Sequence, residues 1–476
     1  MKLKVLHIND IHSRFEELAR IASAIEELRD RDTVVLDAGD NADFARLETE
    51  GTHGRISSAI LDKMRFTARA FGNNEGFAGL PNTKILAKTS RTPVTTCNMY
   101  DLQGRKLGFL NDAVDLNVGG VRILIIGVTA SANVFYHLFG IHVKEPEEEI
   151  RRVLAEKTSH DLVIVLSHLG LNADRKLASA NPDIDIIIGG HSHTTLKEPL
   201  KENQTIICQA GQLGDNLGEL VIDYDTADKR IRSFKGRVIT SKRYPQHPEI
   251  MKLIRNYSRQ ADRNLSVKLY SIDTSLSHSL TEENPIGNLL ADALKDMMKT
   301  EMGLINSGVL NGGVKKGIVT KKMLHALCPS PLNPTRIEIK GVDIYDALRE
   351  SLSKEHQLSD GRGAGFRGQH PGNIQVSSNV RVRLRKNAEG EPEIESVTVD
   401  GEPLDSERWY TVATSDYLQR GSGYPPLAHN RKEKYRVEFL RDVLEEYLAK
   451  KSFVESASTS RFTITGDARK QKLCLE

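Results

Sequence analysis

The sequence has few cysteines, no long apolar run and no excess of charge of one sign. Four of its 476 residues are cysteines, and no two of them form a Cys-x-x-Cys pair, which excludes a disulfide framework and a cysteine zinc site. No run approaches the ~18 apolar residues that a membrane-spanning helix needs. There are 66 basic and 64 acidic residues, a net charge of +2, and this balance argues against a nucleic acid polymer as partner.

The N-terminal stretch Met1–Asp10 is charged, has the pattern of a strand, and holds no apolar segment long enough for a secretory signal. We therefore expect a cytoplasmic protein without a membrane partner. Hydrophobic residues make up 39% and charged residues 27% of the chain, which is the ordinary mix of a globular protein. The length exceeds what one hydrophobic core supports, so two domains are expected.

Short apolar runs alternate with helical patterns over residues 1–225, which predicts an α/β domain. Between Phe15 and Leu28, apolar residues recur every three or four positions, as in an amphipathic helix. Five runs predict strands, namely Leu3–Ile8, Thr33–Leu36, Val121–Val128, Leu162–Leu166 and Ile184–Ile188. Because several of these runs are apolar on both faces, we expect them inside a sheet with helices outside.

The pattern changes after a polar break at Asp225–Lys229. Residues 226–266 predict a connecting segment with a helix that has Pro248 near its start. Residues 267–476 predict a second domain that mixes strands and helices.

Two helical stripes in this second domain run from Ile286 to Met297 and from Val437 to Leu448. The stretch Ser359–Gly372 is rich in glycine, arginine and histidine, which predicts a long surface loop. The four scattered cysteines are interpreted as small apolar fillers or chance surface thiols.

Polar residues of one chemical kind follow the predicted N-terminal strands. The candidate metal ligands among them are Asp10, His12, Asp40, Asn73, His168, His191 and His193. In α/β sheets ligands bind at the carboxyl ends of the strands, so these side chains are expected to meet there. Imidazole, carboxylate and carboxamide suit borderline divalent metals. Because these donors are too many for one ion, we expect two ions ~3.5–4 Å apart.

The spacing of these residues supports a shared site. Asp10 and His12 are two positions apart, as are His191 and His193, and an extended chain points such residues the same way. Glycines at positions 39, 72, 189 and 190 are expected to let the backbone turn sharply beside the metals. An isolated Asp-x-His motif is more often part of a turn than a pair of metal ligands. Five short polar motifs, in order and each at the end of a strand, predict a dinuclear site.

The order of five short motifs along the chain resembles that of the calcineurin-like metallophosphoesterases. The motifs are Asp-x-His, Gly-Asp, Gly-Asn-x-Glu, Ser-His and Gly-His-x-His. More narrowly, the chain is similar to the 5′-nucleotidase/UDP-sugar hydrolase family from end to end. The later matching segments are Gln209–Gly211, Gly287–Ala293, Asn306–Thr320 and Ser415–Tyr424. The resemblance implies an α/β fold, with a four-layer αββα domain followed by a smaller mixed α/β substrate-binding domain.

The resemblance also implies a ligand set and a reaction. It assigns one ion to Asp10, His12, Asp40 and His193. It assigns the second ion to Asp40, Asn73, His168 and His191, so that Asp40 bridges. A water or hydroxide between the ions would attack phosphorus in line, since metal binding lowers the pKa of water from 15.7 to about 7. The ligands tolerate manganese, zinc, iron and cobalt alike.

The phosphorylated small-molecule substrate is expected to bind the second domain. The residues that match the family's substrate segments are Asn306, Gly308, Asn311, Tyr417 and Tyr424. The chain departs from the family at two places, because Asn311 stands where an arginine is common, and the segment near Cys328–Asn333 offers Ser330 but no ring to pair with Tyr417. A nucleotide or nucleotide derivative is the leading substrate class.

The catalytic motif also departs from the family, which usually reads Gly-Asn-His-Glu where this chain has Asn74. A carboxamide donates a hydrogen bond but delivers no proton, and losing a general acid typically costs ~10²–10⁴-fold in rate. The loss matters least where the leaving group is itself a phosphate. His53 is an alternative proton donor, although its position is more typical of a surface turn. A non-nucleotide phosphate as substrate, and a metal-containing binding protein with little turnover, stay open as alternatives.

Overall fold

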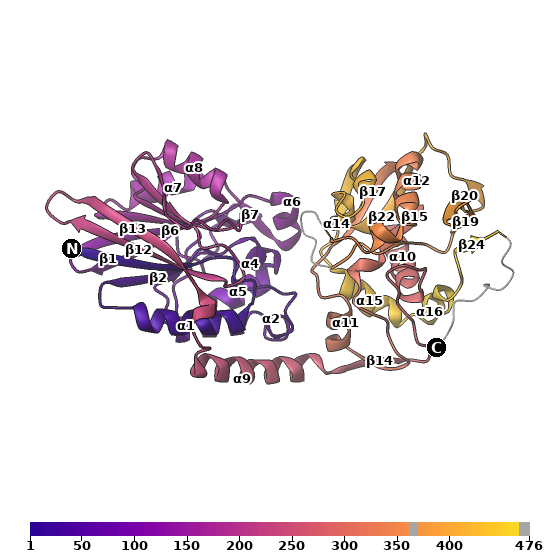
Figure 1. Cartoon of the computed structure of the whole chain (residues 1–476), viewed down its shortest axis with the longest axis horizontal. Helices are drawn as coiled ribbons and strands as arrows, with labels where there is room; N and C mark the ends of the chain where they lie inside the picture. The colour runs from indigo at the N-terminus through magenta and orange to yellow at the C-terminus, as the bar shows by residue number, and fades with distance from the viewer. Residues whose placement is uncertain (362–368, 466–476) are drawn as a thin grey trace. The chain divides into compact units, whose positions relative to one another are not determined.

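The computed structural model describes residues 1–361 and 369–465. The chain divides into two compact units, Met1–Asn264 and Leu265–Glu476. Both units combine helices and sheets (Figure 1), which confirms the predicted α/β class. Among the described residues, none of the helices has the length and apolar character that crossing a bilayer requires.

The first unit contains two large sheets. One has the strand order β13 (Arg230–Thr240), β12 (Asn216–Asp225), β1 (Lys2–Ile8), β2 (Thr33–Asp37) and β3 (Ala68–Arg69). The other has the order β10 (Leu200–Glu202), β11 (Thr205–Cys208), β9 (Ile186–Gly189), β8 (Leu162–His168), β6 (Val121–Thr129) and β5 (Ala113–Val118). Strands β1, β2 and β3 are parallel to one another, as are β6, β8, β9 and β11. A small sheet pairs β4 (Met99–Asp101) with β7 (Ile141–Val143).

Alternate side chains of β1 enter two different cores. Leu3 and Val5 share a core with Ile125 of the second sheet, whereas Leu6 and Ile8 pack among helices. Each sheet therefore has the other sheet on one face and helices on the other, which is the four-layer αββα arrangement implied by the resemblance. The predicted helices outside the sheets cover the outer faces, and the inner faces of the two sheets cover each other.

The helices form the two outer layers. Those beside the first sheet are α1 (Phe15–Leu28), α3 (Arg55–Lys63) and α9 (Pro248–Leu265). Those beside the second sheet are α7 (Pro146–Glu156) and α8 (Leu171–Ala180). Shorter helices near the strand ends are α2 (Leu47–Gly51), α4 (Asn73–Phe77), α5 (Leu80–Lys88) and α6 (Asn133–Tyr136).

The expected connecting segment differs from the structure in its first half. Residues Arg230–Thr240 form the edge strand β13 of the first unit, where the sequence predicted a linker over 226–266. Most of its side chains are exposed or half-buried, so no apolar run marks it as a strand. The helix predicted near Pro248 is α9, and its Ile250 and Ile254 are buried in the core shared with α1.

The second unit is built on a five-stranded sheet of order β18 (Ile374–Val376), β15 (Met302–Asn306), β22 (Trp409–Ser415), β17 (Pro334–Lys340) and β23 (Asn430–Tyr435). A four-stranded sheet has the order β21 (Glu402–Pro403), β20 (Pro392–Val399), β19 (Val380–Lys386) and β24 (Phe462–Ile464). A small sheet pairs β14 (Lys268–Ile272) with β16 (Gly317–Thr320). The helices include α10 (Pro285–Met298), α11 (Lys321–Leu327), α12 (Gly341–Glu350), α13 (Lys354–Gln357), α14 (Asp416–Gln419), α15 (Leu440–Leu448) and α16 (Lys451–Ala457).

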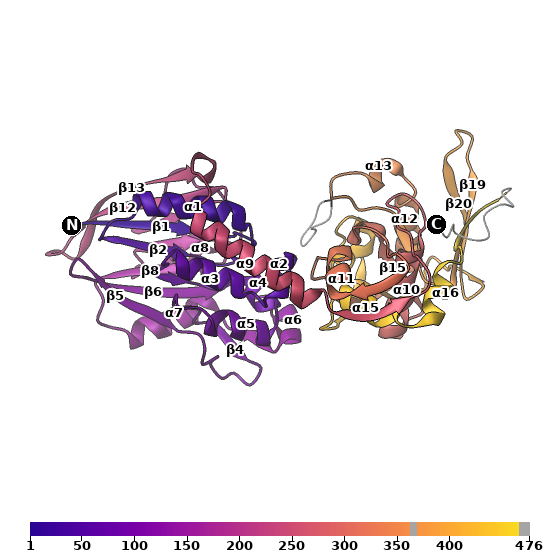
Figure 2. The ribbon, with the colours of Figure 1, turned by 90° about the horizontal axis from the view of Figure 1, so that it is seen from below.

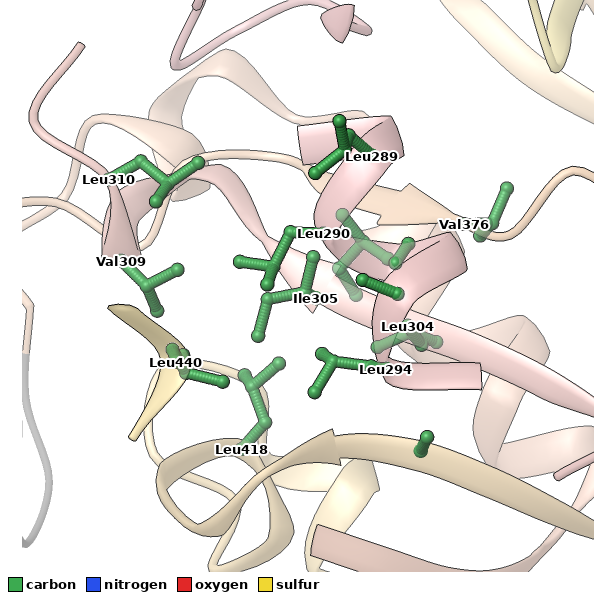
Figure 3. Packing of buried hydrophobic residues seen from close by; sticks show 14 of the residues in the cluster. Leu289, Leu290, Leu294, Leu304, Ile305, Val309, Leu310, Val376, Leu418 and Leu440 are labelled. Atoms are coloured by element: carbon green, nitrogen blue, oxygen red, sulfur yellow. The ribbon is translucent and has the colours of Figure 1, made fainter. Parts of the chain in front are cut away.

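Helix α10 forms the centre of the second core. Its Leu290 and Leu294 lie beside Leu304 and Ile305 of β15 (Figure 3). The second predicted stripe starts later than expected, because Val437 is 51% exposed and precedes α15. Of the predicted loop Ser359–Gly372, residues 362–368 lie outside the described part, and the remainder contains no helix or strand.

Candidate metal centre

The candidate ligands come from the ends of five strands in the two sheets of the first unit. Asp10 and His12 follow β1, Asp40 follows β2, and Asn73 follows β3. His168 is the last residue of β8, and the two remaining histidines follow β9. Because β1–β3 are parallel, and β8 and β9 are parallel, the residues of each sheet emerge at one edge.

Two groups of three side chains have ligand atoms within 4.8 Å of one another. The groups are Asp10, His12 and His193, and Asp10, Asp40 and His168. In the first group, His193 Nε2 lies 3.3 Å from Asp10 Oδ1. In the second, His168 Nε2 lies 3.3 Å from Asp40 Oδ2. The residue common to both groups is Asp10, whereas the resemblance implies Asp40 as the bridge.

The two remaining predicted ligands lie against these groups. His191 Nδ1 is 2.9 Å from Asn73 Oδ1, and the His191 ring meets the His168 ring with centroids 5.1 Å apart. The backbone N–H of His191 donates to Asp10 Oδ2 at 2.9 Å. The structure thus brings all seven predicted ligand residues into one cluster.

The backbone around the cluster is not extended. The prediction that an extended chain points Asp10 and His12, and likewise His191 and His193, the same way is therefore wrong. Five candidate ligands have a positive φ, namely Asp10, His12, Asp40, His191 and His193. Hydrogen bonds between loops hold this conformation, since Asp10 N–H donates to Gly39 O and His12 N–H to Asp40 O, both at 2.9 Å. Such non-glycine conformations cost about 1–3 kcal/mol each and cluster at functional sites.

The glycines beside the cluster serve mainly to leave space, rather than to turn the chain as predicted. Of positions 39, 72, 189 and 190, only Gly39 has a positive φ. A Cβ on Gly72 would collide with Asp40 Oδ1 and would lie 2.7 Å from His168 Nε2. Gly72 therefore lets its backbone approach two candidate ligands more closely than any side chain permits.

The charges in the cluster favour a cation. Asp10, Asp40 and His168 are all buried. Burial opposes protonation of His168, but the Asp40 carboxylate outweighs it and raises the histidine pKa to about 10. For Asp40, burial is likewise outweighed by His168, which holds the pKa of that carboxyl well below its usual range. His168 Nε2 is a buried atom without a well-oriented hydrogen bond to any described residue, and a metal ion would satisfy it.

Asn74, predicted as catalytic, lies behind His12. Its side-chain amide is 2.9 Å from His12 Nδ1, and Asp43 Oδ2 is 3.5 Å from the same nitrogen. The other ring nitrogen, His12 Nε2, lies 3.3 Å from His193 Nε2. The alternative donor His53 instead has its Nδ1 3.2 Å from Asn82 Oδ1 of α5.

Sequence reasoning missed two residues that hold the loops. The buried Glu75 carboxylate accepts N–H groups from Asp40 at 3.1 Å, Ala42 at 2.8 Å and Gly72 at 2.9 Å. Its place three residues after Gly72, at the start of α4, is a capping-box position that could have indicated this. Asn9 donates to Asp10 Oδ2 at 2.7 Å and to Gly211 O at 2.6 Å, and no sequence pattern marked it.

Three of the predicted substrate residues lie at the end of β15 in the second unit or follow it. Asn306 is buried and its amide donates to Pro371 O at 2.6 Å. A Cβ on Gly308 would collide with the carbonyl of Pro371. Asn311 is exposed, and its side chain donates to Ala326 O at 3.3 Å.

The two predicted aromatic residues, Tyr417 and Tyr424, lie near the end of the neighbouring strand β22. Both are buried in the core of the second unit. The Tyr424 hydroxyl donates to the carbonyl of Gly372, and its ring meets His356 with centroids 4.8 Å apart. A substrate ring would reach either tyrosine only by displacing residues that now cover it.

Comparisons with known proteins agree with this architecture. Residues 3–195 match the calcineurin-like phosphoesterase family, and residues 264–429 match the 5′-nucleotidase C-terminal domain. The uncharacterized metallophosphoesterase YunD of Bacillus subtilis is 30% identical over 463 residues, which cover 94% of this chain and 99% of that protein. An apyrase of Tabanus yao is 24% identical over 91% of this chain and 88% of its own.

A solved structure shares the fold over almost the whole chain. The NAD nucleotidase of Haemophilus influenzae matches with a TM-score of 0.68 and 16% identity, covering 98% of this chain and 99% of that one. The family matches and the cluster of candidate ligands make this chain a metal-dependent phosphohydrolase. It belongs to the family in which a calcineurin-like metallophosphoesterase domain is followed by a 5′-nucleotidase C-terminal domain.

Proposed function

We propose that this phosphohydrolase binds two divalent metal ions and acts on nucleotides or nucleotide derivatives. The observation that supports it best is the cluster of seven nitrogen and oxygen ligand residues at the strand ends, which contains two groups of three that share Asp10. Asp10, His12, Asp40 and His193 would hold one ion. Asp40, Asn73, His168 and His191 would hold the other. When bound, the ions lower the pKa of a coordinated water and neutralise charge on the phosphoryl oxygens.

The protein's own groups hold this ligand set in place before any ion binds. The N–H of Asn74 donates to Asp40 Oδ1 at 2.8 Å, and the N–H of His191 donates to Asp10. The His168 Nδ1 lies 2.9 Å from Ala38 O, which leaves Nε2 for the ion. Fixed ligands of this kind need little reorganisation when the ion and the substrate bind.

The position of Asn74 favours substrates with good leaving groups. Its amide is engaged at His12 and supplies no proton to an alkoxide. A phosphate leaving group needs no such proton, so a nucleoside diphosphate or a diphosphate sugar suits the site better than a nucleoside monophosphate. The 5′-nucleotidase C-terminal domain supports the nucleotide class.

Hydrolysis by the purified full-length protein tests the proposal. The protein would be stripped of metal, reconstituted with manganese and assayed on AMP, ADP, UDP-glucose, a 2′,3′-cyclic nucleotide and a sugar phosphate. Asp40→Ala is the inactive blank, and Asp183→Ala, at an exposed loop carboxylate, is the matched control. Metal content would be measured by mass spectrometry on the same samples.

We expect two manganese ions per chain, and ADP or UDP-glucose to react much faster than AMP. Sugar phosphate as the best substrate would replace the nucleotide class by a non-nucleotide one. Bound metal without turnover of any compound would indicate a binding protein. One ion per chain in an active enzyme would contradict the two-metal arrangement.

A further inference from the structure

A second candidate site lies in the first unit, between α1, α3 and α9. These helices line an open cavity of about 970 Å³, and Figure 2 shows α9 running beside the other two. Thr89 and Arg91, which follow α5, also contribute to its wall. None of the seven candidate metal ligands is among the residues that line it. The cavity is therefore separate from the metal centre.

Cationic side chains outnumber acidic ones around this cavity. Its four arginines are Arg29, Arg55, Arg65 and Arg91. Within residues 1–361 and 369–465, none of these four forms an ion pair, unlike arginines such as Arg46, Arg105 and Arg122. Unpaired guanidinium groups gathered at one cavity create a positive potential that attracts anions.

The acidic residues of the cavity already have partners. Glu26 Oε2 lies 3.3 Å from His247 Nε2, and Glu249 Oε2 lies 3.7 Å from Lys63 Nζ. The Asp62 carboxylate accepts the backbone N–H of Arg91 at 2.9 Å. None of these carboxylates binds one of the four arginine side chains, and five lysine and arginine side chains against three carboxylates leave the cavity with a net positive charge.

The guanidinium group of Arg29 is positioned by two hydrogen bonds. Its Nη2 donates to Met64 O at 2.9 Å and to Arg65 O at 3.1 Å, at the C-terminal end of α3. Burial, and then the charge of Arg65, lower the pKa of Arg29. Its Nε and Nη1 make no hydrogen bond to any residue that the structure describes, so they remain open to an anionic ligand.

The floor of the cavity is apolar. Ile25, Met64 and Ile250 line it and are 5% exposed or less. On α9, the half-buried Leu253 and Tyr257 extend this surface. Apolar surface beside a few convergent polar groups is the usual composition of a site for a small organic molecule, and the volume falls in the range of such sites.

We propose that this cavity binds an organic phosphate of about nucleotide size, with its phosphoryl groups on the arginines and its body over Met64, Leu253 and Tyr257. The guanidinium fork matches the geometry of phosphate oxygens. Such a ligand would contact α1, α3 and α9 together. Since α9 ends at Leu265, where the second unit begins, the ligand would strengthen the attachment of this helix to the first unit.

Isothermal titration of the full-length chain with ADP tests the site. A chelator keeps the protein free of metal, so ADP is not hydrolysed. The double variant Arg65→Glu, Arg91→Glu changes two exposed cavity residues. The double variant Arg151→Glu, Arg230→Glu makes the same charge change at exposed positions outside the cavity. Circular dichroism and melting temperature would confirm that each variant is folded.

We expect the cavity variant to lose one class of ADP sites, or to bind it at least tenfold more weakly, while the control variant binds as the parent does. ADP should also raise the melting temperature of the parent and of the control variant, and it should raise that of the cavity variant by a smaller amount. An unchanged number of sites with unchanged affinity in the cavity variant would overturn the proposal. So would the absence of ADP binding in the parent.

A second variant tests the apolar floor without changing any charge. Ala59→Trp fills part of the cavity from α3 and should weaken ADP binding at this site. Inorganic pyrophosphate should bind there more weakly than ADP, because it has no body to cover the floor. Equal binding of the two compounds, unaffected by Ala59→Trp, would contradict an organic ligand.

Discussion

The side-chain amide of Asn74 lies 2.9 Å from His12 Nδ1. His12 Nε2, the other ring nitrogen, points to the candidate metal position, 3.8 Å from Asp10 Oδ1 and 3.3 Å from His193 Nε2. Asn74 thus contacts a candidate ligand at the ring nitrogen that faces away from the candidate metal position. Groups that bind the far nitrogen of a ligating histidine fix its orientation and tautomer.

Asn74→Ala should therefore weaken metal binding by about 10–100-fold, the usual effect of removing a partner of a ligating histidine. Titration of the metal-free protein with manganese measures this directly. Asn172→Ala, at an exposed position of α8, is the matched control and should bind manganese as the parent does. If Asn74→Ala bound metal normally but lost turnover, the amide would act on the substrate and not on His12.

Gly72→Ala should disturb the centre without unfolding the protein. The φ of Gly72 is −89°, which alanine adopts freely, but the new Cβ would press on Asp40 Oδ1 and His168 Nε2. We expect turnover to fall by about 10²-fold, the size of effect that a misplacement of ~1 Å produces. The control is Gly108→Ala, where a Cβ meets nothing within 4 Å. Unchanged kinetics in Gly72→Ala would show that Asp40 and His168 can move away from the new Cβ without any loss of turnover.

The strands and the ligand residues could be predicted from the sequence because each carries its own pattern. The run Val121–Val128, apolar at nearly every position, forms the buried strand β6 as predicted. Asp10 and His12 were predicted together from their spacing. Their left-handed backbone could not be predicted, because hydrogen bonds to Gly39 and Asp40, distant in sequence, impose it.

Other features depend on contacts that no local pattern contains. The edge strand β13 was missed because most of its side chains remain partly exposed, and its pairing with β12 determines its place. The role of Glu75 depends on three N–H groups from two different loops. The burial of Tyr417 follows from packing in the second core, whereas its motif indicated only an aromatic residue near the substrate.

Glu75→Gln should destabilise the first unit by about 1–3 kcal/mol, because an amide replaces a carboxylate that accepts three N–H groups. In either orientation of the amide, its NH₂ group meets a backbone donor and leaves that donor unsatisfied. Denaturant unfolding of the metal-free protein measures the change. Glu148→Gln, at an exposed position of α7, should have almost no effect. Equal stability of both variants would show that the loops do not need this carboxylate.

His7 should make the stability of the first unit fall in mild acid. This histidine is buried on β1, directly against Gly218 of β12, and burial lowers its pKa from 6.5 to about 4. Below pH 6.5 the unfolded chain therefore binds a proton that the folded chain binds only near pH 4. The folded state loses stability across this interval, by about 2 kcal/mol at pH 5 relative to pH 8.

The variant His7→Gln isolates this contribution. The substitution itself changes stability at every pH, but only the parent has the extra acid dependence, so the quantity to compare is the loss between pH 8 and pH 5. Metal-free samples with chelator keep the candidate ligands in the same state in both proteins. We expect the variant to lose about 2 kcal/mol less than the parent over this interval. Parallel curves for the two proteins would mean that His7 is protonated in the folded state as readily as in the unfolded one.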